Sequence, residues 1–131
     1  MNTLQAHILT PDGPVFEGEI KSIRLPGVEG DFQVLQQHAS LISSLTIGPV
    51  SIVQPDGKSH KFAISGGLVE VNQNQVTLFA EAAEHREKIN LERARAAKER
   101  AEQRLKESQY DQARAEASLR RAINRLKIAQ K

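Results

Sequence analysis

Apolar residues in the first two-thirds of the chain recur at every second position, in short runs separated by polar and turn-forming residues. The runs are Leu4/Ala6/Ile8, Ile23/Leu25, Phe32/Val34, Val50/Ile52, Phe62/Ile64, Val69/Val71 and Val76/Leu78. All 5 Pro and all 8 Gly lie before residue 68, and Pro11-Asp12-Gly13 and Pro55-Asp56-Gly57 have the composition of tight turns. Short strands joined by such turns predict an antiparallel β-sandwich or flattened barrel over residues 1–84.

From residue 90 onward Gly and Pro are absent, and the apolar period becomes helical. One stripe consists of Leu91, Ala94, Ala97, Ala101 and Leu105, and a second consists of Ala115, Leu119, Ala122, Leu126 and Ala129. Residues 106–111 carry no stripe and no strong helix breaker, so an antiparallel two-helix hairpin is predicted, with one long broken helix as the competing form. The fold class is therefore α+β in two parts, with residues 85–89 as a hinge and residues 90–131 as the hairpin.

The seam between the two predicted helices consists mostly of alanine. Burying a methyl group contributes only about 0.8 kcal/mol, so such a seam allows close approach but supplies little free energy. Each helix is also long enough to persist in part alone, because isolated helices become viable beyond ~12–15 residues. These properties suit a mobile element that can detach and act as a switch.

Charge divides the chain at the same point as the hydrophobic pattern. Residues 1–84 hold 4 Lys/Arg and 9 Asp/Glu, a formal charge of −5, whereas residues 85–131 hold 14 and 7, a formal charge of +7. This division is hidden in the net charge of +2. It predicts two modules with different partners, of which the basic one is attracted to an acidic surface.

Catalytic and metal-binding chemistry is not indicated. The chain has no cysteine, its 4 histidines are scattered, and it contains neither a phosphate-binding loop nor a nucleophile elbow. Asp31, His38 and Ser40 fit turn and surface positions better than a triad. No apolar run approaches the ~20 residues of a membrane-spanning helix, and no signal peptide is expected.

Arginines repeat at the same spacing in both predicted helices: Arg93, Arg100 and Arg104 in the first, and Arg114, Arg121 and Arg125 in the second. Steps of seven and four residues keep each set on one helical face. One interpretation is a solvated face supported by the i,i+4 pairs Glu84–Lys88, Glu102–Lys106 and Glu116–Arg120. The other is an arginine cluster that binds phosphate or an acidic protein surface.

Several segments together resemble one family over essentially the whole chain. They are TPDGPVFEGE (10–19), LPGVEGDFQVLQQHASLISSLTIGPVSI (25–52), ISGGLVEVNQNQVTLFAEAAE (64–84), RARAAKERAEQRL (93–105) and SLRRAINRL (118–126). In these segments the chain resembles the epsilon subunit of the bacterial and chloroplast F-type ATP synthase. The SGG strand pair and the His-Ala-x-Leu segment are the most specific pieces.

The resemblance implies a non-catalytic central-stalk subunit of a proton-translocating complex. The sandwich would clamp the gamma subunit and sit on the ring of c subunits, at the cytoplasmic face of a bacterial plasma membrane rather than on a thylakoid. The hairpin would permit turnover when folded. When extended along gamma, its basic second helix would reach the beta (and alpha) subunits and inhibit ATP hydrolysis.

The resemblance also implies two sets of binding residues. A ring-facing loop would include Glu29, Gly30, Asp31 and His38, although Gln33, Gln36-Gln37 and Ser40 depart from the family pattern there. The resemblance implies no required cofactor, but it does imply a regulatory site for ATP with Mg in the folded hairpin. This site would comprise Glu84, Ile89, Asn90, Arg93, Ala94, Arg100, Arg121 and Arg125.

Asn90 is the one departure from the family's ATP motif, which has Asp at this position. Asn and Asp are equally good helix N-caps, so one interpretation of Asn90 is a cap and nothing more. A charge-assisted hydrogen bond contributes ~1.5–3 kcal/mol against ~1 kcal/mol for a neutral one, so the change predicts ATP affinity lowered roughly ten-fold. Two other interpretations are a purely structural stalk subunit and a basic nucleic-acid-binding adaptor, the latter disfavoured because aromatic residues are scarce.

Overall fold

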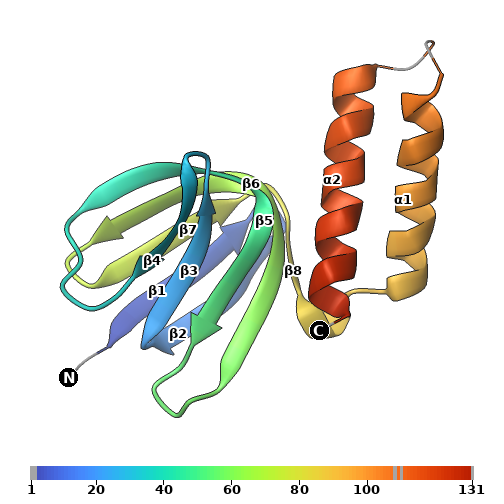
Figure 1. Ribbon diagram of the computed structural model, residues 1–131. Helices are drawn as coiled ribbons and strands as arrows, with labels where there is room; N and C mark the ends of the chain where they lie inside the picture. Colours follow the sequence, from blue (N-terminus) through green and yellow to red (C-terminus); the bar gives the residue numbers. More distant parts are fainter. Residues whose placement is uncertain (1–2, 108, 110, 131) are drawn as a thin grey trace.

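In the part of the chain that the structure describes, eight strands occupy the region predicted to be β and extend to His85, and two helices follow them (Figure 1). The computed structural model describes residues 3–107, 109 and 111–130; Met1 and Asn2, together with Ser108, Tyr110 and Lys131 of the predicted hairpin, lie outside the described residues. The elements are β1 (Leu4–Thr10), β2 (Gly13–Ile20), β3 (Ser22–Gly27), β4 (Gly30–Val34), β5 (Leu41–Val53), β6 (Ser59–Asn72), β7 (Gln75–Ala80), β8 (Ala83–His85), the 3-10 turn η1 (Arg86–Lys88), α1 (Leu91–Leu105) and α2 (Gln112–Ala129).

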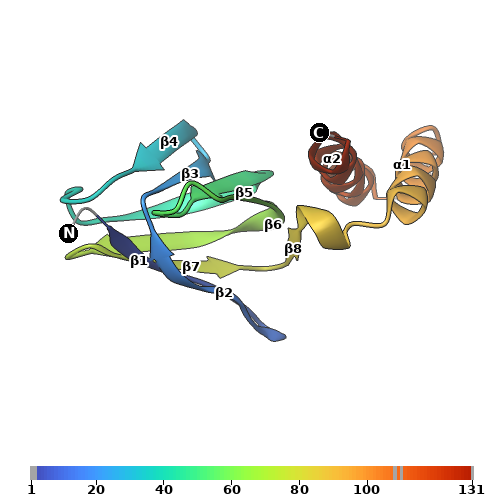
Figure 2. The same cartoon turned by 90° about the horizontal axis from the view of Figure 1, so that it is seen from below.

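The strands form one continuous hydrogen-bonded path in the order β2-β1-β7-β6-β5-β3-β4, with β8 pairing with β6. The predicted sandwich is confirmed, with β3, β4 and β5 lying over β1, β2 and β7 (Figure 2). One pairing departs from the antiparallel expectation: β1 runs parallel to β7. This is the junction between two antiparallel hairpins, β1–β2 and β6–β7, so it brings together strands that no tight turn connects.

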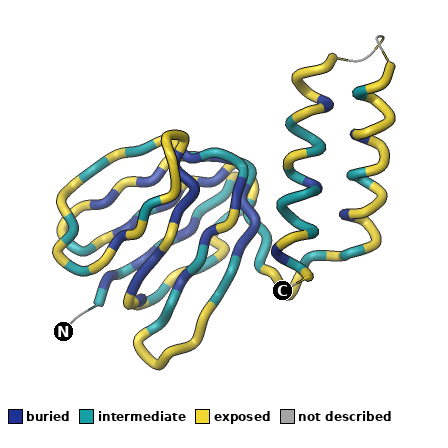
Figure 3. The backbone as a smooth tube through the Cα atoms, in the orientation of Figure 1, coloured by how far each residue is buried: buried dark blue, intermediate teal, exposed yellow. Residues whose placement is uncertain are grey.

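The alternation of apolar residues reflects burial between the two layers of the sandwich. Every residue of the seven alternating runs is buried except Phe32, which is partly buried against the same core. Figure 3 shows the resulting change between buried and exposed positions along the strands. The predicted turns at residues 11–13 and 55–57 are also present, and Gly13 and Gly57 adopt φ values of 121° and 91°.

The Gly66-Gly67 pair of the SGG segment interrupts the pairing of the two longest strands. The register passes from Leu45↔Gly67 to Ile47↔Ser65, so one residue on each strand is skipped. Gly67 has φ 151°, and a Cβ placed there would lie 2.1 Å from the carbonyl oxygen of Phe79 on β7. Only glycine lets β6 and β7 approach this closely, which explains the SGG sequence physically.

The helices form the predicted antiparallel hairpin rather than one long broken helix (Figure 1). Asn90 caps α1 and Asp111 caps α2, because each side chain accepts a hydrogen bond from the backbone N–H three residues later. The buried residues of the seam are all alanines: Ala94, Ala101, Ala115 and Ala122. The alanine-rich seam predicted from the sequence is therefore present.

The hairpin contacts the sandwich through α2, which packs on β5, β6 and η1. Arg120 Nη2 donates to Thr46 Oγ1 at 2.9 Å, and Asn124 Nδ2 donates to the Gly48 carbonyl oxygen at 3.0 Å. Ile128 is the one residue of α2 outside the seam that is buried. Beside it lies a cavity of about 380 Å³ lined by both apolar and polar residues, so the interface is incompletely packed.

Candidate functional site

A cavity of about 440 Å³ lies where the sandwich, the hinge and the hairpin meet. Its walls come from β8, η1, the residues just before α1, and both helices. We call it the hinge cavity, and it is lined by Glu84, Lys88, Ile89, Asn90, Arg93, Ala94, Ala96, Ala97, Arg100 and Arg125.

Local backbone geometry brings these residues together. The 3-10 turn ends at Lys88, and Ile89 and Asn90 are extended, with ψ of 126° and 112°, so the chain leaves β8 and turns into α1. Arg93 and Arg100 are seven residues apart and therefore share the face of α1 that lines the cavity. Arg125 reaches the same cavity from α2, because its antiparallel course returns its C-terminal half to the hinge.

The charge of the hinge cavity is strongly positive. Lys88, Arg93, Arg100 and Arg125 supply four cations against the single carboxylate of Glu84. The positive end of the α1 helix dipole lies at the same place. Guanidinium groups converging from two helices can hold phosphate oxygens through paired charge-assisted hydrogen bonds, so the arrangement suits an anionic ligand.

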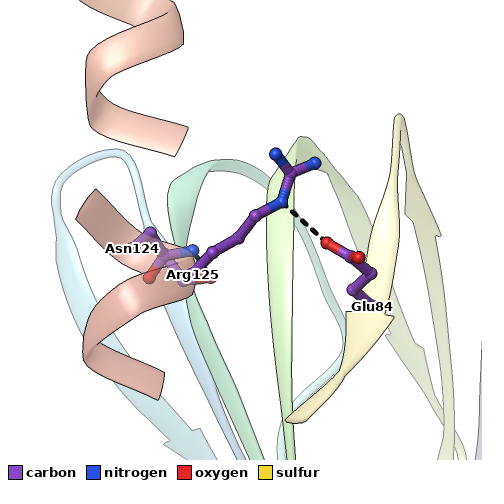
Figure 4. A network of polar contacts seen from close by, with 4 residues as sticks. Glu84, Asn124 and Arg125 are labelled. Atoms are coloured by element: carbon purple, nitrogen blue, oxygen red, sulfur yellow. Dashed lines mark hydrogen bonds and ion pairs between the residues drawn. The ribbon is translucent and has the colours of Figure 1, made fainter. Parts of the chain in front are cut away.

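Glu84 and Arg125 form an ion pair across the cavity wall. Arg125 Nε lies 2.7 Å from Glu84 Oε1, and Figure 4 shows this contact beside Asn124. The Arg125 side chain is 34% exposed and that of Glu84 is 39% exposed, so solvent screens the pair and its contribution to stability is modest. Glu84 therefore pairs with Arg125 and not with Lys88, its predicted i,i+4 partner. The i,i+4 spacing does not bring Glu84 and Lys88 together here, because residues 84–88 form a strand end and a 3-10 turn instead of an α-helix.

Asn90 occupies the N-cap of α1 with its side chain beside the cavity. Its Oδ1 accepts a hydrogen bond from the Arg93 backbone N–H at 3.0 Å. The predicted capping role is confirmed, and the same residue lines the hinge cavity.

Seven of the eight residues predicted to bind a nucleotide line the hinge cavity: Glu84, Ile89, Asn90, Arg93, Ala94, Arg100 and Arg125. Arg121 does not; its Nη2 donates to Ser118 Oγ at 3.0 Å, and it lines two neighbouring hollows. One of these also includes Arg104 and Arg114, so the six arginines of the repeated spacing divide into two groups of three. Lys88, Ala96 and Ala97 also line the cavity but were not predicted from the sequence; the alanine positions could have been found from the helical face that they share with Arg93 and Arg100.

The second predicted set does not form a single loop. Glu29 is in the turn between β3 and β4, and Gly30 and Asp31 begin β4. His38 lies beyond the other end of β4, where its Nδ1 is 2.7 Å from the Ala39 carbonyl oxygen. The expectation of one loop was wrong because residues 30–34 pair with β3 as a strand, so these residues form two separate surface points.

Comparison with known protein families covers almost the whole chain. Residues 3–86 match the beta-sandwich domain of the ATP synthase delta/epsilon chain, and residues 87–130 match its long alpha-helix domain. The chain belongs to the ATP synthase delta/epsilon chain family.

Individual members of this family align over nearly their full length. An ATP synthase epsilon chain of Shouchella clausii is 46% identical over 129 residues, which cover 98% of this chain and 96% of the relative. An ATP synthase epsilon chain of Halalkalibacterium halodurans is 47% identical over 132 residues, with 98% of each chain covered. The family resemblance in the sequence is therefore confirmed.

Solved structures show the same fold. A chain of the Euglena gracilis mitochondrial ATP synthase superposes with a TM-score of 0.85 at 22% identity, covering 98% of this chain and 82% of that one. A chain of the Tetrahymena thermophila mitochondrial ATP synthase central stalk and c-ring gives 0.63 at 17% identity, covering 96% of each. Within the described part of this delta/epsilon family member, neither helix is long and apolar enough to cross a membrane.

Proposed function

We propose that this chain is the epsilon subunit of a proton-translocating F-type ATP synthase, a non-catalytic subunit of the central stalk. Relatives that carry this name align with it from end to end at 46% and 47% identity. Because both relatives are bacterial, the proposed location is the cytoplasmic face of a bacterial plasma membrane, with peripheral attachment through the complex.

In this role the sandwich docks on the gamma subunit and the c-ring. Exposed apolar side chains on the outer face of the sheet suit gamma. Leu68 and Phe79 pair across β6 and β7 and are 40% and 48% exposed, and Ile42 on β5, opposite Glu70 on β6, is 67% exposed. An apolar surface of this kind is favourable when a partner covers it. Glu29, Gly30, Asp31 and His38 offer the ring two polar contact points instead of one.

The hairpin is the regulatory part of the proposed function. Its attachment to the sandwich rests on a few polar contacts and Ile128 beside a cavity, and its own seam is alanine. Both features lower the free energy needed to release the hairpin from the sandwich. A released α2 carries the basic surface that suits an acidic segment of the beta (and alpha) subunits, where it inhibits ATP hydrolysis.

ATP with Mg is the proposed regulatory ligand of the folded hairpin. The observation that carries this proposal is the convergence of Arg93, Arg100 and Arg125 on one cavity with Glu84 and Asn90. Its volume of about 440 Å³ is within the usual range of small-molecule sites, roughly 300–1,000 Å³. The arginines suit phosphate oxygens, and Glu84 can accept hydrogen bonds from ligand hydroxyl or amino groups. A ligand that bridges both helices and β8 stabilises the folded form and so relieves inhibition.

Calorimetric titration of the full chain with MgATP tests the binding proposal. We expect weak binding that Arg93→Gln reduces and Arg95→Gln leaves unchanged, because Arg95 is exposed on the same helix outside the hinge cavity. Absence of heat at millimolar nucleotide would overturn the proposal.

The alternative of a purely structural stalk subunit is tested by a second experiment. ATP hydrolysis by the assembled catalytic head is measured with and without residues 90–131. Regulation predicts faster hydrolysis after truncation, whereas unchanged hydrolysis would favour the structural role.

A further inference from the structure

Two histidines join the hinge to the sandwich through a continuous chain of hydrogen bonds. His60 on β6 lies with its Nε2 2.9 Å from Gln54 Oε1 and its Nδ1 3.1 Å from His85 Nε2. His85, the last residue of β8, accepts at its Nδ1 from the Glu87 backbone N–H at 3.1 Å and thereby caps η1. The chain thus runs from the β5–β6 turn to the first residues of the hinge.

The atoms at the two ends fix the direction of every bond in the chain. Gln54 Oε1 can only accept, so His60 carries its proton on Nε2. The Glu87 N–H can only donate, so Nδ1 of His85 is unprotonated. The inner bond then has His85 Nε2–H donating to His60 Nδ1, and both imidazoles are neutral.

An additional proton cannot be accommodated in this chain. A proton on Nδ1 of His60 would face the N–H of His85. If His85 changed tautomer to avoid that conflict, its Nδ1–H would face the Glu87 N–H. Protonation of either ring therefore places two donors against each other at one of two links, and one link must break.

The surroundings favour the neutral form. The rings of Phe16 on β2 and Phe62 on β6 pack against His60 and His85 at centroid distances of 5.7 and 5.0 Å. Burial, with His60 close by, lowers the pKa of His85 below its ordinary value of 6.5.

Charged groups also lie on the elements next to this pair. On η1, Arg86 and Lys88 lower the pKa of His85 further, while Glu87 opposes them. Glu84 of β8 is paired with Arg125 of α2, and Glu17, next to Phe16 on β2, lies 3.7 Å from His7. Glu84 and Glu17 thus have a cationic and a histidine partner of their own, respectively.

We propose that His60 and His85 form a proton-sensitive latch that holds η1 against the sandwich and releases it on acidification. The extra proton binds more readily to the released form, because release removes the burial and the nearby His60 that lower the pKa of His85. The latch is therefore complete above pH 6.5 and is lost as the pH falls through the lowered value. Glu84, Lys88, Ile89 and Asn90 of the hinge cavity adjoin the latch in sequence, so its release reaches the hairpin; this last step alone rests on the proposed function.

The latch is tested directly by nuclear magnetic resonance of the full chain between pH 8 and 5.5. At pH 8 both imidazoles should be Nε2–H tautomers, and the Glu87 amide should be protected from hydrogen exchange. Relative to intrinsic exchange, this protection should fall by up to about tenfold per pH unit as one proton binds.

A matched set of variants separates the latch from general acid effects. His85→Asn keeps a side-chain oxygen that can cap η1 but cannot titrate, so Glu87 should remain protected at low pH. His7→Gln removes a histidine outside the chain of bonds and should leave the wild-type pH dependence intact. Protection that does not change with pH, or that changes equally in His85→Asn, would overturn the proposal.

Release of the hairpin is followed in the same samples. The chain has no cysteine, so Lys58→Cys and Glu99→Cys, both at exposed positions, can carry a donor and an acceptor dye. If the dye distance grows as Glu87 loses protection, both the latch and a mobile hairpin are supported. If Glu87 loses protection at constant dye distance, the latch is supported and the proposed hairpin movement is not.

Discussion

Replacing Asn90 by Asp tests how much the absent negative charge lowers helix stability and nucleotide affinity. Asn90 Oδ1 accepts from the Arg93 N–H at 3.0 Å, and a carboxylate oxygen can take the same place without moving the backbone. A negative charge at the start of a helix contributes roughly 0.3–1 kcal/mol through the helix dipole. Because Asn90 is exposed, we expect the lower half of that range, and we expect the gain to shrink in high salt.

The effect on nucleotide binding should be larger than the effect on folding. A carboxylate at this position lies in a cavity with Lys88, Arg93, Arg100 and Arg125, where it can orient a guanidinium or accept from the ligand. Exchanging a neutral hydrogen bond for a charge-assisted one contributes about 1–1.5 kcal/mol more. Asn90→Asp should therefore tighten MgATP binding about tenfold, at ~1.4 kcal/mol per factor of ten.

Titration calorimetry and thermal unfolding of the two proteins measure both quantities. Asp111→Asn is the matched control, because Asp111 caps α2 in the same way, accepting from the Arg114 N–H at 3.2 Å, but lies outside the hinge cavity. The control should lower hairpin stability slightly and leave affinity unchanged. An unchanged affinity in Asn90→Asp would mean that Asn90 is only a cap, and a weaker one would mean that repulsion of phosphate dominates; either result refutes the reasoning.

Three further predictions concern stability. Gly67→Ala should lower the free energy of unfolding by about 3 kcal/mol or more in urea titration, because its Cβ would lie 2.1 Å from the Phe79 carbonyl oxygen; Gly13→Ala, which meets no atom within 4 Å, should cost clearly less. Ile128→Ala should cost about 2 kcal/mol of hairpin docking, seen as a longer dye distance with the sandwich transition unchanged; a shift of the sandwich transition instead would contradict it. The thermal midpoint should fall between pH 7.5 and 5.5, since the pKa of His85 is lowered in the folded chain and the unfolded chain binds the proton more readily; His85→Asn should reduce this fall.

The strands and helices could be predicted from the sequence wherever apolar residues recur with a regular period. Seven alternating runs marked strands of the sandwich, and the alanine stripes marked both helices. Alternation did not reveal β2, because its Val15 is exposed and its Gly and Pro residues weaken the pattern. Ile128 was missed for a related reason: α2 buries one face against α1 and another against the sandwich, so a single stripe does not describe it.

The residues of the hinge cavity could be predicted only in part, because they depend on how the hairpin docks on the sandwich. The arginine spacing fixes one face of each helix, but it cannot say which residues of the two helices meet. Docking places Arg125 with Arg93 and Arg100, and leaves Arg121 one helical turn away with Arg104 and Arg114. The contact between His60 and His85 was also beyond prediction, because it joins β6 to a short strand that the sequence pattern does not mark.

Residues 84–90 connect every part of the molecule that the proposed regulation requires. Glu84 holds α2 through Arg125, His85 holds β6 through His60, and Asn90 begins α1. A ligand in the hinge cavity and a proton on the histidine pair act on this one short segment with opposite effects on the folded hairpin. Linkage then requires reciprocity: if nucleotide stabilises the latched hinge, bound nucleotide must lower the pKa of His85 by the same free energy. The pH at which Glu87 loses protection should therefore fall when MgATP is present, and an identical midpoint with and without nucleotide would show that the two sites act independently.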